Sequence, residues 1–270
     1  MTEQSRRIEP GFYWIQEPGP DRSHFIEEGY DELPDWYDPD DTLHVPQNAY
    51  LIADEASLLF DTLSPASTDT ILAELDSRLD GPLDYLVPSH PDVPHAGNTR
   101  PILEAYPDAT LVAPRYGNAH ELYHLDDAEH VGEGDRIDLG RYEVTFHRAT
   151  FPDAPIHVWM SESRTGTLFP VDWLGYPNRG SEILRFPDEF ETDLTVERLV
   201  QFAGRVLFWF QYVDAPTVAR TIDALIDQFD PEIVAPGHGN PIREDAVGAM
   251  ELSKPVVERV QTGGRVGTLG

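Results

Sequence analysis

Three places in the sequence put histidine or aspartate side chains soon after a short apolar run. The residues concerned are His90, Asp92, His95, Asp172 and His238. Short apolar runs bounded by turn residues are typical of buried strands. Because strand ends in α/β proteins converge on one edge of a sheet, these side chains can meet in one pocket although they are far apart in sequence.

Histidine and carboxylate side chains together favour iron, manganese or zinc, because calcium and magnesium prefer oxygen ligands alone. In the segment PSHPDVPHAGN, His90 and Asp92 alternate across one residue and His95 follows a proline-containing turn, so one loop can direct all three into one site. On spacing alone, these three can equally be ordinary loop residues. Likewise, Asp172 can be a turn residue at a strand end, and His238 can be part of the turn PGHG. The residues by themselves therefore give a hypothesis of metal binding.

The segments that would position these residues alternate between strands and helices. Apolar runs predict strands over residues 12–15, 50–53, 57–60, 83–87, 110–113, 136–139, 142–146, 157–160, 167–170 and 232–235. Helical spacing predicts helices over residues 68–79, 99–106, 118–125, 196–212, 218–229 and 246–260. Residues 17–47, rich in proline and acidic side chains, are predicted to form a surface loop. The alternation indicates an α/β fold, and because each half runs from strands to helices, we expect a four-layer αββα sandwich.

The composition limits the class of protein. With 270 residues, 40% of them hydrophobic, the chain is expected to form a single domain over residues 1–270. The formal net charge is −30, from 49 acidic against 19 basic residues, which argues against a nucleic-acid partner because phosphate contacts need clustered Lys and Arg. Such a surface repels itself at ordinary salt and is screened in molar salt, so we interpret it as halophilic adaptation rather than as a catalytic feature.

Some metal chemistries and locations are excluded by residues that the sequence lacks. There is no cysteine, so thiolate ligands, iron–sulfur clusters and disulfides are excluded, and any metal must use imidazole and carboxylate. No apolar run approaches the ~20 residues of a membrane span, and Arg6-Arg7 is not followed by an apolar signal segment. We therefore expect a cytoplasmic protein without a membrane partner.

Four motifs together resemble the metallo-β-lactamase superfamily, and within it the β-lactamase-like domain of flavodiiron proteins and the related oxygen-binding diiron proteins. They are NAYLIADEASLLFDTL, SHPDVPHAGNTRPILEAYPDATLVAP, GEGDRIDLGRYEVTF followed by LFPVDWLGY, and IVAPGHGNPIR. The second is the most specific, because the family pattern is His-x-Glu-x-Asp-His-x-Gly followed by a helix and a Tyr-Pro-x-Ala-x-hydrophobic strand. The resemblance covers most of the chain, from Asn48 to Arg243, and implies the metallo-β-lactamase fold.

Position by position, the resemblance implies a pair of metal ions. His90 and Asp92 match ligands of the first metal, His95 and His238 match ligands of the second, and Asp172 matches the carboxylate that bridges them. Two histidines and one carboxylate at the second position are the set used by non-haem iron(II) sites with open positions. We therefore expect one or two metal ions, iron first, with zinc or manganese as alternatives.

Two positions depart from the family pattern. Pro94 stands where an aspartate would bind the second metal, and Thr150 stands where a third histidine is expected in the stretch Thr150-Phe-Pro-Asp153. Each metal therefore loses one protein ligand, and weakened binding, or occupation of the second position alone, is expected. His147 or His157 can replace the missing histidine, although packing or hydrogen bonding on a strand is the simpler interpretation of both.

Three functions follow from this resemblance. The first is binding, sensing or reducing O2 or NO at a non-haem iron site. The second is metal-dependent hydrolysis of an ester, thioester or lactone by a metal-bound water, although hydrolases of the superfamily usually keep the aspartate that Pro94 replaces. The third is a non-catalytic domain that has lost its metals.

The partners implied by the first function are a small-molecule ligand or substrate and an external electron-transfer protein. The second partner is needed for reduction because we find no flavodoxin domain or glycine-rich flavin loop within the 270 residues. A homodimer is left open.

Overall fold

The computed structural model describes residues 4–27, 33–115 and 128–262. The chain divides into two compact units, unit 1 with residues 1–17 and 47–165 and unit 2 with residues 18–46 and 166–270. The helix predicted over residues 118–125 and the glycine-rich end of the chain lie outside the described residues. In the three described ranges, no helix has the length and apolar character that crossing a membrane requires.

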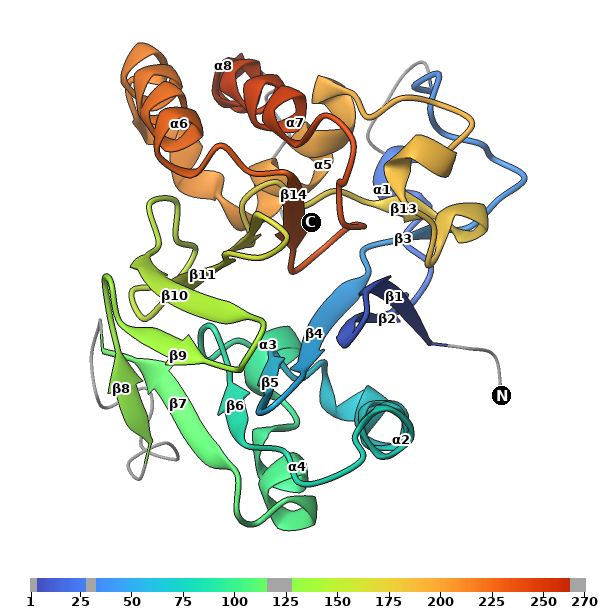
Figure 1. The fold of residues 1–270 in the computed structure, drawn as a ribbon. Helices are drawn as coiled ribbons and strands as arrows, with labels where there is room; N and C mark the ends of the chain where they lie inside the picture. Colours follow the sequence, from blue (N-terminus) through green and yellow to red (C-terminus); the bar gives the residue numbers. More distant parts are fainter. Residues whose placement is uncertain (1–3, 28–32, 116–127, 263–270) are drawn as a thin grey trace. The chain divides into compact units, whose positions relative to one another are not determined.

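Unit 1 contains a seven-stranded sheet with the strand order β1-β2-β4-β5-β6-β7-β8 (Figure 1). Its strands are β1 (Ser5–Glu9), β2 (Phe12–Glu17), β4 (Gln47–Ala53), β5 (Ser57–Phe60), β6 (Tyr85–Val87), β7 (Thr110–Pro114) and β8 (Glu129–Val131). The strands from β1 to β5 pair antiparallel, whereas those from β5 to β8 pair parallel. Parallel neighbours need crossover connections, and helices supply two of these.

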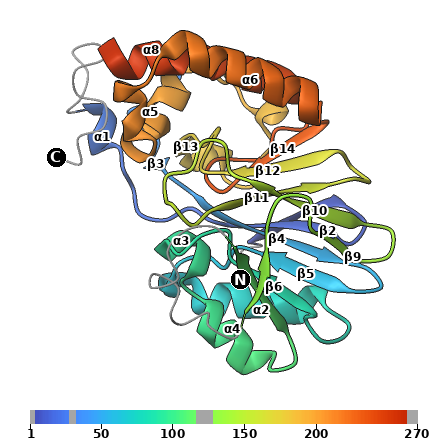
Figure 2. The same cartoon turned by 90° about the vertical axis from the view of Figure 1, so that its left-hand side faces the viewer.

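The helices of unit 1 lie between parallel strands in the sequence. They are α2 (Thr68–Arg78), α3 (Val93–Ala96) and α4 (Thr99–Ala105), with a 3₁₀ turn at Pro65–Ser67 before α2. Figure 2 shows α2 and α4 together on one side of β4, β5 and β6. On that side, Ile15 and Leu51 of the sheet share a core with Ile71 of α2 and Ile102 of α4.

A second, antiparallel ladder of unit 1 consists of β9 (Arg136–Asp138), β10 (Glu143–Arg148) and β11 (Val158–Glu162). Phe12 of β2 meets Tyr142 edge to face, with ring centroids 6.5 Å apart, so the first sheet is covered on its second face as well. The predicted strands over residues 136–139, 142–146 and 157–160 are thus present within one or two residues of their expected ends.

Unit 2 is mostly helical, with short strands. Its elements are α1 (His24–Glu27), β3 (Leu43–His44), β12 (Thr167–Val171), β13 (Asn178–Arg179), the 3₁₀ turns Gly180–Glu182 and Pro187–Glu189, α5 (Val196–Val206), the 3₁₀ helix Phe208–Tyr212, α6 (Ala215–Phe229), β14 (Ile233–Pro236), α7 (Ala246–Leu252) and α8 (Lys254–Thr262). β12 and β14 pair in parallel, and β3 pairs antiparallel with β13. Figure 2 shows α6 and α8 on one side of β12 and β14.

Three segments differ from the sequence-based expectation. The segment expected to be a surface loop contributes buried side chains to unit 2, namely Ile26, Trp36, Tyr37 and Leu43, which form a small core of their own. The helix expected over 196–212 ends at Val206 and continues as a 3₁₀ helix. The helix expected over 246–260 is interrupted at Ser253, because the ring of Pro255 lacks an N–H and clashes with the preceding helical turn.

Candidate metal centre

The loop after β6 positions two of the predicted ligands in unit 1. His90 and His95 are each 1% exposed, and His95 lies in the single turn of α3. Pro94 occupies the first turn of that helix, where a missing N–H costs nothing and the fixed φ favours the turn. The residue that departs from the family pattern therefore helps to begin the helix that carries His95.

Asp61, directly after β5, orients His95. Its Oδ2 accepts a hydrogen bond from His95 Nδ1 at 2.7 Å, and its Oδ1 accepts the backbone N–H of Ser89 at 2.8 Å. Asp61 is itself buried and adopts φ +64°, a left-handed conformation that aspartate tolerates better than most residues. Because a carboxylate accepts the Nδ1 proton, the lone pair of His95 lies on Nε2, as in many histidine ligands of metals.

His90 lies among other imidazole rings. Its ring centroid is 4.1 Å from that of His95 and 4.5 Å from that of His157, and it stacks on His157 with an interplanar angle of 18°. His90 Nδ1 is 3.0 Å from Ser89 Oγ. Three buried imidazoles thus gather within unit 1, two of them from one loop and the third from the segment before β11.

Asp153 is a residue of this cluster that sequence reasoning did not propose as a ligand. Its carboxylate is 10% exposed, and Oδ1 accepts a hydrogen bond from His157 Nδ1 at 3.0 Å. Its Oδ2 lies 3.5 Å from His90 Nε2. Thr150, at the position of the expected histidine, is exposed. The i,i+4 spacing of Asp153 and His157 was a signal that pointed to this pair.

The remaining candidates in unit 1 are more open to solvent. The carboxylate of Asp92 is 58% exposed and lies 3.9 Å from His90 Nε2. His147, on β10, contacts Ser161 Oγ at 2.8 Å and Glu133 at 3.4 Å, and burial lowers its pKa below the ordinary value of 6.5. Of the two histidines considered as replacements for the one expected at Thr150, His157 is therefore the one that lies beside His90.

Unit 2 brings Asp172 and His238 together. Asp172 follows β12 and His238 follows β14, and the parallel pairing of these strands places Asp172 Oδ1 3.3 Å from His238 Nε2. His238 Nδ1 donates to the backbone carbonyl of Pro46 at 2.8 Å, so its lone pair lies on Nε2, toward Asp172. Gly239 has φ +90°, and a Cβ there would lie 2.8 Å from the ring of Tyr176, so the turn requires glycine.

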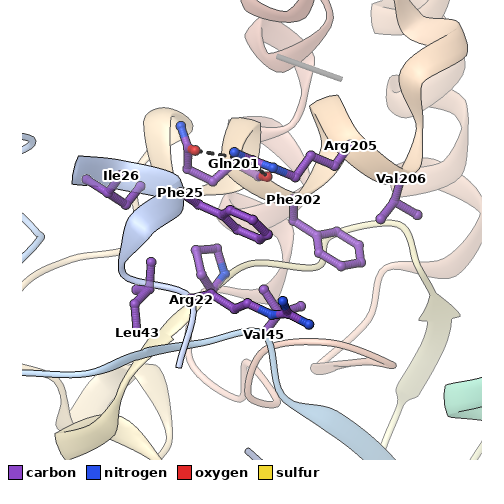
Figure 3. Close-up of a pocket in the computed structure, with 10 residues that line it drawn as sticks. Arg22, Phe25, Ile26, Leu43, Val45, Gln201, Phe202, Arg205 and Val206 are labelled. Carbon is purple, nitrogen blue, oxygen red and sulfur yellow. Dashed lines mark hydrogen bonds between the residues drawn. The ribbon is translucent and has the colours of Figure 1, made fainter. Parts of the chain in front are cut away.

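Unit 2 contains a pocket with a volume of about 280 Å³ (Figure 3). Phe202 lines this pocket, and its ring centroid lies 4.9 Å from that of His238. Phe25 also lines the pocket. The guanidinium carbons of Arg22 and Arg205 lie 5.6 and 4.6 Å from the centroid of its ring. Phe202 therefore links the pocket wall directly to the position of His238.

The donor chemistry of these residues fits a transition metal. In unit 1, His90, Asp153 and His157 each offer a ligand atom within 4.8 Å of the others, and Asp172 and His238 do so in unit 2. Buried carboxylates are costly unless a cation or hydrogen-bond donors compensate the charge. Imidazole with carboxylate suits iron, manganese or zinc, and the histidine nitrogens held by hydrogen bonds are typical of metal sites.

The sequence is similar to curated proteins that handle dioxygen and nitric oxide. A rubredoxin-oxygen oxidoreductase from Megalodesulfovibrio gigas is 26% identical over 201 residues, which cover 71% of this chain and 48% of that protein. A nitric oxide reductase from Moorella thermoacetica is 28% identical over 206 residues, which cover 73% of this chain and 50% of that protein. The chain thus spans about half the length of these curated relatives.

Solved structures and a family profile agree on the fold. The rubredoxin:oxygen oxidoreductase of Desulfovibrio gigas superposes with a TM-score of 0.73 at 23% identity, covering 96% of this chain and 62% of that one. A metal-soaked flavodiiron core from Synechocystis gives a TM-score of 0.70 at 22% identity, with the same coverage. The expected α/β fold, with sheets flanked by helices, and the resemblance to the flavodiiron core are therefore confirmed. Because the profile of the metallo-β-lactamase superfamily matches residues 43–238, this chain belongs to that superfamily.

Proposed function

We propose that the protein binds iron and uses it to bind or reduce dioxygen or nitric oxide. The proposed ligands are the five predicted from the sequence: His90, Asp92, His95, Asp172 and His238. One observation supports the proposal most strongly: His95 and His238 are buried, and each gives its Nδ1 proton to a fixed acceptor, which leaves the lone pair of Nε2 available to a metal. We propose dioxygen and nitric oxide as ligands because the names of the curated relatives refer to oxygen and nitric oxide.

In this proposal the protein residues hold and tune the centre. Asp61 makes the imidazole of His95 more basic, because the hydrogen bond to a carboxylate raises the electron density on the ring. The carbonyl of Pro46 fixes the orientation of His238 without adding a charge. When bound, iron(II) with open positions supplies the binding site for the gas and the redox chemistry.

The electrons for any reduction would come from an external one-electron carrier protein. One curated relative carries rubredoxin in its name, so a rubredoxin-like protein is the donor that we propose. Protons for the reduced product would come from solvent. A donor with a basic contact surface would be attracted by a chain of net charge −30 at low salt, and salt would weaken that attraction.

The test is anaerobic loading with iron(II) followed by metal analysis and exposure to nitric oxide. We expect up to two iron ions per chain, a new visible absorption with nitric oxide, and oxidation of the iron by dioxygen. Zinc with turnover of a generic thioester or lactone would instead support hydrolysis. A protein that is folded in high salt and retains no metal would contradict both activities and support a non-catalytic member of the superfamily.

We also propose that the acidic surface is an adaptation to high salt and that the protein works in the cytoplasm of a halophile. The support is the net charge of −30 with a single lysine, Lys254. Screening of like charges by molar salt would stabilise the folded state. Thermal unfolding in 0.1 M and in molar KCl tests this, and a melting temperature that does not rise with salt would contradict it.

A further inference from the structure

We propose that Asp153 is a metal ligand alongside His90 and that His157 holds the Asp153 carboxylate in position. This inference rests on the proposed function, because it concerns the same metal centre. It assigns two residues that were not among the five predicted ligands. His157 is buried, the side chain of Asp153 is only 10% exposed, and both lie beside His90 within unit 1.

The distances suit a metal bound by His90 and Asp153. Ligand atoms about 2.1 Å from one ion lie about 3.0 Å apart at right angles and about 3.4 Å apart at the tetrahedral angle. His90 Nε2 and Asp153 Oδ2 are 3.5 Å apart, which matches the wider value. Asp92 Oδ2 is 3.9 Å from the same nitrogen, and its side chain is 58% exposed. Asp153 therefore needs a smaller movement than Asp92 to reach an ion bound by His90.

The ring geometry assigns a different role to His157. A metal binds an imidazole nitrogen in the plane of the ring. The rings of His90 and His157 are within 18° of parallel, with centroids 4.5 Å apart, so one ion cannot lie in both planes unless a ring tilts. His157 is therefore a positioning residue, and its Nδ1–H donates to Asp153 Oδ1. Hydrogen bonds of this kind commonly orient carboxylate ligands.

The resulting ligand set has consequences for the choice of metal. His90, Asp92 and Asp153 would give this position one imidazole and at least two carboxylates. Carboxylate oxygen favours iron(II) and manganese(II) over zinc(II), which is the softer ion. Asp153 thus supplies the ligand that Thr150, at the surface, does not provide, but as an oxygen donor in place of nitrogen.

The experiment compares Asp153→Ala and Asp153→Asn with a matched control, Glu133→Gln. Glu133 also contacts a histidine of unit 1, His147, but at the surface. The probes are iron(II), cobalt(II) and manganese(II), and the readouts are the number of ions per chain, their dissociation constants and the visible spectrum of bound cobalt. For Asp153→Ala we expect loss of one ion, or affinity for it reduced by more than the 10–100-fold typical of a lost second-sphere group.

Variants at position 157 separate ligation from positioning. In His157→Gln the amide can still donate to Asp153, so we expect affinity within about 10-fold of the unmodified protein, whereas His157→Ala should lose about 10–100-fold. Equal and complete metal loss in both His157 variants would make His157 the ligand and overturn the assignment. Circular dichroism of the metal-free variants in high salt checks that each is folded.

The outcome also separates this inference from the proposed function. If the unmodified protein binds iron and both Asp153 variants bind it equally well, the Asp153 assignment is wrong and the proposed function stands. If the folded, unmodified protein binds no metal, the proposed function fails, and the assignment fails with it. Glu133→Gln should match the unmodified protein within two-fold in every metal titration, and a loss equal to that of Asp153→Asn would show a general charge effect and overturn the assignment.

Discussion

The candidate ligands of unit 1 and those of unit 2 are held in different ways. In unit 1 the imidazole of His95 donates to the carboxylate of Asp61, and the imidazole of His157 donates to the proposed ligand Asp153. In unit 2 the imidazole of His238 donates to a backbone carbonyl. Unit 1 thus places a negative charge behind His95, whereas unit 2 fixes His238 with a neutral group.

This difference determines which parts of the centre a mutation can change. A carboxylate partner can be removed by one substitution, and it strengthens the ligand by polarising the imidazole. A backbone carbonyl remains in every variant and contributes orientation with less polarisation. We therefore expect metal binding by His95 to depend also on the carboxylate behind it, and metal binding by His238 to depend mainly on the imidazole itself.

The largest effect is expected for His238, the candidate histidine ligand of unit 2. His238→Ala should remove one ion or weaken its binding by more than about 100-fold, because the 10–100-fold of a second-sphere change is the lower bound for a lost ligand. His147→Ala, a surface-side change on β10, should leave metal content unchanged. The measurement is iron per chain after anaerobic loading and gel filtration. Equal metal loss from the two variants would mean that His147 is also a ligand, in place of the histidine expected at position 150.

The next effect tests the carboxylate behind His95. Asp61→Asn keeps the size of the side chain and removes its charge, so the imidazole of His95 loses polarisation. We expect metal affinity to fall about 10–100-fold while the ion count at saturating metal is unchanged. Competition with a chromophoric chelator gives the dissociation constants. An Asp61→Asn protein with unchanged affinity would remove the distinction between the two units.

A smaller effect is expected for Phe202, which lines the pocket of unit 2 and contacts His238. Phe202 is 4% exposed and packs against that ring. Phe202→Leu should lower the free energy of unfolding by about 1–3 kcal/mol, since a buried aromatic ring is replaced by a smaller side chain. It should weaken metal binding by only a few-fold, because Pro46 still fixes the imidazole. Urea unfolding and metal titration together test this, and a loss as large as that of His238→Ala would show that packing rather than the carbonyl holds His238.

The smallest effect concerns His147 and pH. Burial lowers the pKa of His147 below 6.5, so protonation is less favourable in the folded state than in the unfolded one. The neutral ring therefore stabilises the fold fully above pH 6.5, and this contribution is lost as pH falls through the lowered pKa. His147→Gln should show a weaker loss of stability between pH 7 and pH 5, measured by denaturant unfolding. A steeper loss in the variant would contradict the sign.

Much of the fold follows from local patterns in the sequence, because apolar runs and helical spacing report burial directly. Helix α6 and strands β6, β7 and β14 appear close to the predicted ranges. The divided helix around Ser253 was missed because apolar spacing continues across Pro255. The buried residues of 18–46, such as Trp36, were missed because polar residues and prolines separate the apolar side chains that pack together there, so no helical or strand spacing links them.

The candidate site was only partly predictable. The pairing of Asp172 with His238 follows from strand ends and from the family motif, and the structure brings these two together. Asp61 was not proposed, because a carboxylate that orients a histidine has no fixed spacing from it in the sequence. Asp153 was not proposed, because residues four apart outside a helix meet only where the fold bends the chain. For Asp61 and His95 the separation is 34 residues, so only the fold shows the contact.

The most direct test of the central claim is a double-mutant cycle on iron(II) affinity with His95→Ala, His238→Ala and the double variant. If both histidines bind one ion, each single change should remove that ion and the double variant should lose no more at that position. If each single variant loses a different ion and the double variant loses both, the two histidines do not share a metal, and the assignment of His95 and His238 to one ion is contradicted.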